Sequence, residues 1–141
     1  MDSALLDTNV ILDFFVDTRP EHATGDALFR QMAAARTTMC VAATSLKDVY
    51  YVLSRTDSEA TARRAVTAIM ASMTILPVDA GCCRRALSLG EPDFEDAIVR
   101  AAAELAKVDC IVTDDRKAFK GSLIPSLSPG DALVHLNRTT G

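Results

Sequence analysis

Short apolar runs alternate with longer amphipathic segments along this chain, and this alternation constrains the fold more than any other feature. The apolar runs lie at residues 4–6, 38–42, 74–78, 110–112 and 123–125. Segments with helical spacing of apolar residues lie between them, at 10–15, 21–35, 44–55, 59–73, 80–89 and 94–105, and a last short helix opens at 128–129. Parallel strands need long crossover connections, usually helices. The order therefore predicts an α/β fold with a central, mostly parallel sheet of four or five strands and helices on both faces.

Length and composition indicate one globular domain over residues 1–141. Hydrophobic residues make up 49% and charged residues 24% of the chain, as in ordinary soluble domains. No apolar run approaches the roughly 20 residues of a membrane helix, and the start of the chain does not resemble a secretory signal peptide. The cysteines at 40, 82, 83 and 110 lack the spacing of a zinc site. We therefore expect a cytoplasmic protein with reduced thiols and no membrane segment.

The net charge is weakly negative, because 15 lysines and arginines stand against 19 aspartates and glutamates. This balance argues against a protein that holds nucleic acid by a bulk positive field. A metal-dependent nuclease stays open, since such an enzyme concentrates acids in its site and offsets them with divalent cations.

Acidic side chains follow two of the predicted strands and lie early in two of the predicted helices. Asp7 comes directly after the first strand, and Asp114 and Asp115 come directly after the fourth. Asp48 and Asp96 lie near the starts of two helices. In an open parallel sheet, sites form outside the carboxyl ends of the strands. We therefore expect these acids at one edge of the sheet.

Each acid also has a local explanation. Asp93 fits a helix cap, and Asp96 is spaced to pair with Arg100. Asp48 fits a surface charge or a partner of Lys47 or Arg55. Asp13 fits a helix-end or surface contact, and the acids after the fourth strand fit a turn or a helix cap. Taken singly, each local explanation is the better one, but together they require a coincidence.

Convergence of the acids would create a site for a divalent cation. Carboxylates that meet in one cleft repel one another and raise each other's pKa, and a cation neutralises them. Ligands that are all oxygen, with neither cysteine nor histidine, select Mg²⁺ or Mn²⁺. The matching chemistry is metal-assisted attack on a phosphodiester bond.

Four segments, in this order, resemble the PIN-domain ribonucleases. They are DTNVILD, TSLKDVYYVL, DFEDAIVRAAA and CIVTDDRKAF, and the tail IPSLSPGDALVHL also resembles the family. The likeness covers nearly the whole chain. It implies a PIN-like three-layer α/β/α fold and a Mg²⁺- or Mn²⁺-dependent endoribonuclease that hydrolyses RNA. It further implies the toxin of a VapC-type toxin–antitoxin pair, with a cognate antitoxin protein as partner.

The resemblance also assigns roles to single residues. Asp7 matches the first acid of the family, a central metal ligand, and Asp96 and Asp115 match the third and fourth. Asp48 stands where the family most often has glutamate, and its shorter side chain implies ligation through water. The implied catalytic set is therefore Asp7, Asp48, Asp96 and Asp115, with Asp7, Asp96 and Asp115 as metal ligands. Supporting roles fall to Asn9, Thr113, Asp93 and Asp114.

Basic and apolar positions indicate the partners. Arg116, Lys117 and Lys120 follow the fourth acid and are placed to hold RNA phosphates. Only five phenylalanines and two tyrosines occur, so base stacking is not expected to dominate recognition. The helices over 44–73 carry more apolar residues than one core-facing stripe needs. They predict a homodimer or an antitoxin contact through Tyr51, Val52, Ile69, Met70 and Met73.

Other functions fit the pattern less completely. A haloacid-dehalogenase-type phosphatase carries a second aspartate two residues after the first, where this chain has Asn9. A receiver domain carries paired acids near its first strand, which are missing here. A non-catalytic PIN-like module that binds RNA or protein would lack some of the acids, whereas all four positions are filled.

Overall fold

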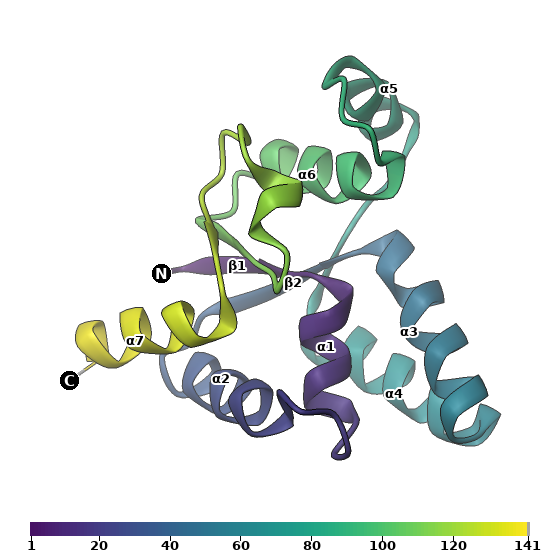
Figure 1. Cartoon of the computed structure of the whole chain (residues 1–141), viewed down its shortest axis with the longest axis vertical. Coiled ribbons are helices and arrows are strands. Elements are labelled where there is room, and N and C mark those ends of the chain that lie inside the picture. The colour runs from purple at the N-terminus through teal and green to yellow at the C-terminus, as the bar shows by residue number, and fades with distance from the viewer. Residues whose placement is uncertain (141) are drawn as a thin grey trace.

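The chain forms a central parallel sheet with helices packed on both faces (Figure 1). The computed structural model describes residues 1–140. Its strands are β1 (Ser3–Leu6), β2 (Thr38–Ala42), β3 (Thr74–Leu76), β4 (Cys110–Val112) and β5 (Ser126–Leu127). Its α-helices are α1 (Thr8–Phe15), α2 (His22–Ala34), α3 (Ala43–Thr56), α4 (Glu59–Ser72), α5 (Ala80–Ser88), α6 (Phe94–Ala106) and α7 (Pro129–Thr140), and a 3₁₀ turn, η1, spans Arg116–Phe119. The predicted α/β class with a five-stranded sheet is confirmed.

The strand order places a topological switch point beside β1. The order is β3-β2-β1-β4-β5, and every neighbouring pair is parallel. From β1 the chain builds β2 and β3 on one side, and it returns to build β4 and β5 on the other. Open parallel sheets leave a crevice outside the carboxyl ends of the strands at such a point. Asp7 after β1 and Asp115 after β4 therefore border the same crevice.

Side chains alternate between the two faces of the sheet and build an apolar core on each. From β1, Ala4 and Leu6 join the core under α1, α2, α3, α4 and α7, whereas Leu5 joins the core under α5 and α6. Ile111 of β4 faces the same side as Leu5. Figure 1 shows the two helical layers on opposite sides of the sheet. Both faces are covered, which is why the strands read as nearly continuous apolar runs.

The fifth strand lies later in the chain than the sequence pattern predicts. The pattern indicates residues 123–125, but the ladder with β4 pairs Ile111 with Ser126. Leu123 is 77% exposed, and its amide donates to Glu104 Oε2 at 2.8 Å. This part of the apolar run is therefore held by a carboxylate of α6 and not by the sheet edge.

The cysteine thiols belong mainly to the packed interior. All four are free, and Cys40, Cys82 and Cys110 are buried. Burial raises the pKa of the Cys110 thiol to about 11, so it stays protonated and packs as a small apolar side chain. Over residues 1–140, no helix combines the length and the apolar character needed to cross a membrane.

A buried acid joins α5, α6 and the segment before β5. The side chain of Glu104 is 1% exposed, and its oxygens lie 3.0 Å from Arg85 Nη2 and 3.5 Å from Arg100 Nε. Burial by itself would raise the pKa of Glu104, but the Leu123 amide and the two guanidinium groups outweigh it and lower the pKa below its ordinary value. The carboxylate is therefore ionised at neutral pH and compensated, as a buried charge must be.

Replacing Glu104 with glutamine removes this charge and keeps the shape of the side chain. We expect Glu104→Gln to lower the free energy of unfolding by about 3 kcal/mol, because breaking a buried pair leaves its partners uncompensated. Urea unfolding at pH 7 measures the loss. The matched control is Glu59→Gln. Its 68% exposed carboxylate pairs with Arg63 and accepts from the hydroxyl of Tyr50, an arrangement that glutamine can still accept from, so the loss should be less than about 1 kcal/mol. Equal losses in the two variants would contradict the structural role of Glu104.

Candidate active site

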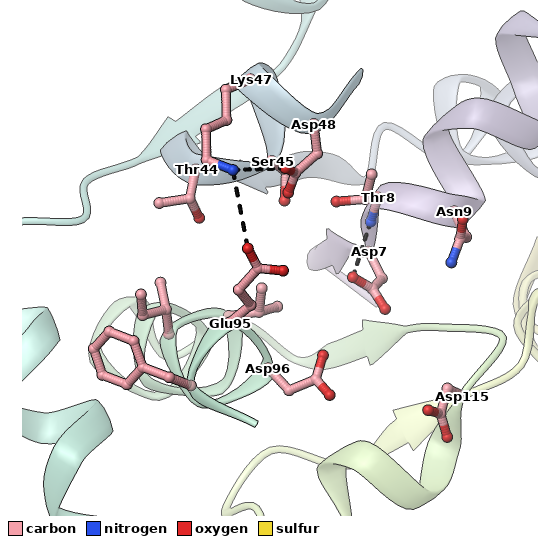
Figure 2. A pocket seen from close by; sticks show the side chains of 13 residues that line it. Asp7, Thr8, Asn9, Thr44, Ser45, Lys47, Asp48, Glu95, Asp96 and Asp115 are labelled. Atoms are coloured by element: carbon pink, nitrogen blue, oxygen red, sulfur yellow. Dashed lines mark hydrogen bonds and ion pairs between the residues drawn. The ribbon is translucent and has the colours of Figure 1, made fainter. Parts of the chain in front are cut away.

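A pocket lined by acids opens at the switch point between β1 and β4 (Figure 2). Five of its lining side chains are carboxylates, and one, Lys47, is a cation. Its lining is Asp7, Thr8, Asn9, Thr44, Ser45, Lys47, Asp48, Phe94, Glu95, Asp96, Ile98, Val99 and Asp115. The structure thus brings together the four acids that the sequence singles out as a catalytic set.

Asp7 is oriented by hydrogen bonds to both of its carboxylate oxygens. It is the N-cap of α1, and its Oδ1 accepts from the amide of Thr8 at 2.9 Å. Its Oδ2 accepts from the hydroxyl of Thr113 at 2.9 Å. The Asp7 amide donates to the carbonyl of Val112 at 3.0 Å, which extends the pairing of β1 with β4 by one residue. The carboxylate is therefore held in place by groups of the protein itself.

Thr113 ties the ends of β1 and β4 together. It is fully buried, and its hydroxyl donates to Asp7 and accepts from the amide of Asp115 at 3.0 Å. A hydroxyl group has one proton to donate and lone pairs to accept, and Thr113 uses both functions here. The relative position of two pocket acids thus depends on one buried side chain.

The pocket carboxylates raise each other's pKa. Burial raises the pKa of Asp7, the hydrogen bonds to its oxygens oppose this rise, and the charges of Asp115 and Asp48 add to it. Burial and then the charges of nearby acids raise the pKa of Asp96 to about 6. Negative charge is therefore concentrated in the pocket beyond what its own residues neutralise.

Asp48 projects from α3 and is paired with its neighbour in the chain (Figure 2). Lys47 Nζ lies 2.7 Å from Asp48 Oδ1 and 4.0 Å from Oε1 of Glu95 on α6. These two distances place the ammonium group of Lys47 between α3 and α6, and the hydrogen bond to Asp48 raises its pKa. The sequence offers Lys47 as a partner of Asp48, and the structure shows that pair, but sequence reasoning named neither Lys47 nor Glu95 as a site residue. Their positions beside Asp48 and Asp96 were the available signal.

Two acids at the start of α6 have different roles: Asp93 caps the helix, and Asp96 lines the pocket. Asp93 is the N-cap, and its Oδ1 accepts from the amide of Asp96 at 3.2 Å. The side chain of Asp96 lines the pocket. Arg100, one turn later, forms its ion pairs with Glu91 and Glu104. The local explanation of Asp96 as a partner of Arg100 is therefore wrong for the part of the chain described.

Asp114 faces a buried acid of α1. It is absent from the described lining of the pocket, and loss of solvation followed by the neighbouring carboxylate of Asp13 raises its pKa to about 6. Asp13 itself is 3% exposed and pairs with Arg19 Nε at 2.8 Å. Asp13 does make a contact at the end of α1, but the contact is buried and not on the surface. An acid inside the otherwise apolar stretch VILDFF was the signal for a buried ion pair.

The basic residues that follow the fourth acid lie beyond the pocket. Arg116, Lys117 and Lys120 are exposed, and none of them belongs to the described lining. Arg116 pairs with Asp131 of α7 at 3.6 Å. They form an exposed basic segment directly after Asp115.

The donors in the pocket suit a hard divalent cation. The 13 lining residues offer carboxylate, hydroxyl and amide oxygens and include neither histidine nor cysteine, and such ligands match Mg²⁺ or Mn²⁺. Among residues 1–140, no three acidic, histidine or cysteine side chains are grouped closely enough to hold a metal ion as they stand. Carboxylates repel one another across a pocket until a cation neutralises them.

Solved structures share the fold of this chain. A toxin–antitoxin complex from Klebsiella pneumoniae matches with a TM-score of 0.68 and 21% identity, over 89% of this chain and 97% of that chain. The sarcin-ricin loop cleaving toxin VapC20 of Mycobacterium tuberculosis matches with a TM-score of 0.67 and 15% identity, over 82% and 92%. VapBC2 of Rickettsia felis, bound to promoter DNA, matches with a TM-score of 0.71 and 14% identity, over 89% and 98%.

The amino-acid sequence itself identifies the family. No curated protein sequence matches the chain, but the family model of the PIN domain matches residues 3–117. That range runs from β1 through Asp115 and contains all the acids of the pocket. The chain belongs to the PIN domain family.

Proposed function

We propose that this protein is a metal-dependent endoribonuclease that hydrolyses RNA phosphodiester bonds. The observation that carries the proposal is the convergence of Asp7, Asp48, Asp96 and Asp115 on one pocket at the switch point of the sheet. The raised pKa values of Asp7 and Asp96 support it, because sites that bind cations gather carboxylates in this way. Membership of the PIN domain family supports the same reaction class.

We propose Mg²⁺ or Mn²⁺ as the cofactor, with Asp7, Asp96 and Asp115 as its ligands. Asp48 contributes through water, because its side chain is short and already pairs with Lys47. When bound, the ion supplies a Lewis acid that lowers the pKa of a water molecule and offsets charge on the phosphate.

The residues of the chain prepare the pocket for an RNA strand. Thr113 holds Asp7 and the amide of Asp115 in one arrangement. Lys47 places an ammonium group on the pocket wall, where it reduces the repulsion that a phosphate meets. Phe94, 44% exposed, contributes an aromatic face on which an unpaired base can stack. We therefore propose single-stranded or looped RNA as the substrate, because duplex RNA does not offer unstacked bases.

We further propose that the protein is the toxin of a toxin–antitoxin pair and that a cognate antitoxin protein binds it. The Klebsiella pneumoniae structure is a toxin–antitoxin complex, and the Mycobacterium tuberculosis protein is a toxin. This chain covers nearly all of the length of both proteins. Its cytoplasmic location is part of the same proposal, since RNA and the antitoxin are found there.

A homodimer through α3 and α4 completes the proposal. Tyr51 and Met70 are 55% and 57% exposed on these helices, which is unusual for large apolar side chains. Ile69 and Met73, which the sequence places on the same surface, are buried in the core instead, and Val52 packs partly against that core. Helical spacing alone does not separate a core stripe from a neighbouring exposed stripe, which explains the error.

Replacing Asp7 tests the proposed chemistry. We expect Asp7→Asn to lower cleavage of total RNA in Mg²⁺ or Mn²⁺ by about 100-fold or more, because an amide is a poor ligand for a hard cation and carries no compensating charge. Chelator should abolish cleavage by the wild type. The matched control is Asp17→Asn, an exposed aspartate outside the pocket. Equal activity of the two variants, or cleavage that survives chelator, would contradict the proposed function.

Repulsion in the pocket predicts a pH-dependent effect of Asp96. Its pKa of about 6 in the folded protein exceeds the ordinary 3.8, so ionisation costs the folded state stability as the pH rises from about 4 to above 6. In chelator at pH 7.5, we expect Asp96→Asn to melt at a higher temperature than the wild type. The difference should vanish near pH 4, and Mg²⁺ should raise the melting temperature of the wild type more than that of the variant. A variant less stable at pH 7.5 would indicate a structural role.

The toxin hypothesis predicts an effect on growth. Expression of the wild type alone should arrest a bacterial host, because uncontrolled RNA cleavage stops protein synthesis, whereas Asp115→Asn should be tolerated. Co-expression of a small protein encoded beside this gene should relieve the arrest. Colony counts after induction measure both effects. Normal growth with abundant soluble wild-type protein would exclude a toxin and leave a housekeeping nuclease.

A further inference from the structure

An ion pair between the buried Asp13 of α1 and Arg19 links this helix to the segment that follows it. The side chain of Asp13 is 4% exposed, and its Oδ1 accepts from Nε of Arg19 at 2.8 Å. His22 Nδ1 lies 2.8 Å from the carbonyl oxygen of Asp13. A Cβ added to Gly25 would come within 3.1 Å of the Asp13 backbone. The close approach of α2 therefore fixes Asp13, and Asp13 in turn fixes the guanidinium group.

The same guanidinium group reaches a residue of the pocket. Arg19 Nη2 lies 3.3 Å from Oδ1 of Asn9, and Asn9 lines the pocket near Asp7. A guanidinium group carries donors and no acceptor. The oxygen of the Asn9 amide must therefore face Arg19, which turns the nitrogen away from it. Figure 2 shows this nitrogen on the side of the pocket where Asp115 lies.

The direction of the Asn9 amide matters because the pocket is rich in acceptors. The oxygens of its five carboxylates accept hydrogen bonds, and the non-bridging oxygens of a phosphodiester also only accept. We propose that Arg19 is a positioning residue that turns Nδ2 of Asn9 into the pocket, where it donates a hydrogen bond to a non-bridging oxygen of the substrate phosphate. This inference rests on the proposed function for the identity of the substrate. Asn9 contacts the phosphate, and Arg19 acts through Asn9.

Arginine performs this task because two nitrogens of one rigid group bond to two partners. Nε holds Asp13 and Nη2 holds Asn9, whereas a lysine offers a single nitrogen at the end of a flexible chain. Arg19→Lys therefore keeps a positive charge beside the buried carboxylate and releases the amide. A matched control is Arg30→Lys on α2, whose 79% exposed side chain pairs with Asp26 away from the pocket.

Nuclear magnetic resonance measures the chemical shifts of the side-chain amide of Asn9 directly. The chain has two asparagines, Asn9 and the exposed Asn137, so ¹⁵N-asparagine labelling yields two side-chain amide pairs, which Asn137→Gln assigns. With Mg²⁺ present, inorganic phosphate should shift the Asn9 pair and leave the Asn137 pair unchanged. Arg19→Lys should abolish this response, and Arg30→Lys should retain it. A response that survives Arg19→Lys, or a titration that moves neither pair, overturns the proposal.

Cleavage kinetics provide a second test, made at a temperature at which circular dichroism shows each variant to be folded. Asn9→Ala and Arg19→Lys should each lower kcat/KM about 10- to 100-fold, as expected for one hydrogen bond to a charged group. The double variant should be no slower than Asn9→Ala, because both changes remove the same hydrogen bond. Losses that multiply in the double variant overturn the proposal. If the wild type cleaves no RNA, the proposed function fails, and the phosphate titration still decides the role of Arg19.

Discussion

Unpaired negative charge at the carboxyl ends of β1 and β4 is the constraint on which the rest of the site depends. The strand order brings Asp7 and Asp115 to the same crevice, and the surrounding helices add further acids. Such crowding opposes folding, because the unfolded chain separates these charges. The fold tolerates it by fixing Asp7 through the Thr8 amide and the Thr113 hydroxyl. It also places one ammonium group, that of Lys47, between two walls of the pocket.

The acids buried away from the pocket are treated differently. Glu104 contacts two guanidinium groups, and Asp13 contacts the guanidinium group of Arg19. These pairs link neighbouring elements, and each places at least one guanidinium group against a buried carboxylate. Asp7 and Asp96 have no guanidinium partner in the described structure, and burial followed by the charges of neighbouring acids raises their pKa. This contrast, within one small domain, separates carboxylates that pair with arginines from carboxylates that face other acids in the pocket.

The fold is shared with toxins and toxin–antitoxin complexes at low sequence identity, so the scaffold alone does not specify a substrate. Further groups surround the acids of this chain. Asp48 is paired with Lys47, Phe94 forms part of an apolar wall, and Arg19 reaches Asn9 from behind the pocket. Together with the acids, these groups set the shape and charge of the pocket.

The sequence by itself determined the α/β class, the parallel sheet and the edge at which the acids gather, because the alternation of apolar runs and the position of Asp7 just after a strand are local patterns. Only the tertiary structure decided which acids stay unpaired. The ion pair of Asp13 with Arg19 and the hydrogen bond from the Leu123 amide to Glu104 join segments that are separate in the chain. The spacing of apolar residues along the sequence carries no information about such contacts. The pocket likewise exists only because β4 returns beside β1. The spacing of residues within a helix or strand sets which face of that element a side chain occupies. Whether the side chain is buried and whether its charge is paired depend on the elements that the folded chain packs against that face.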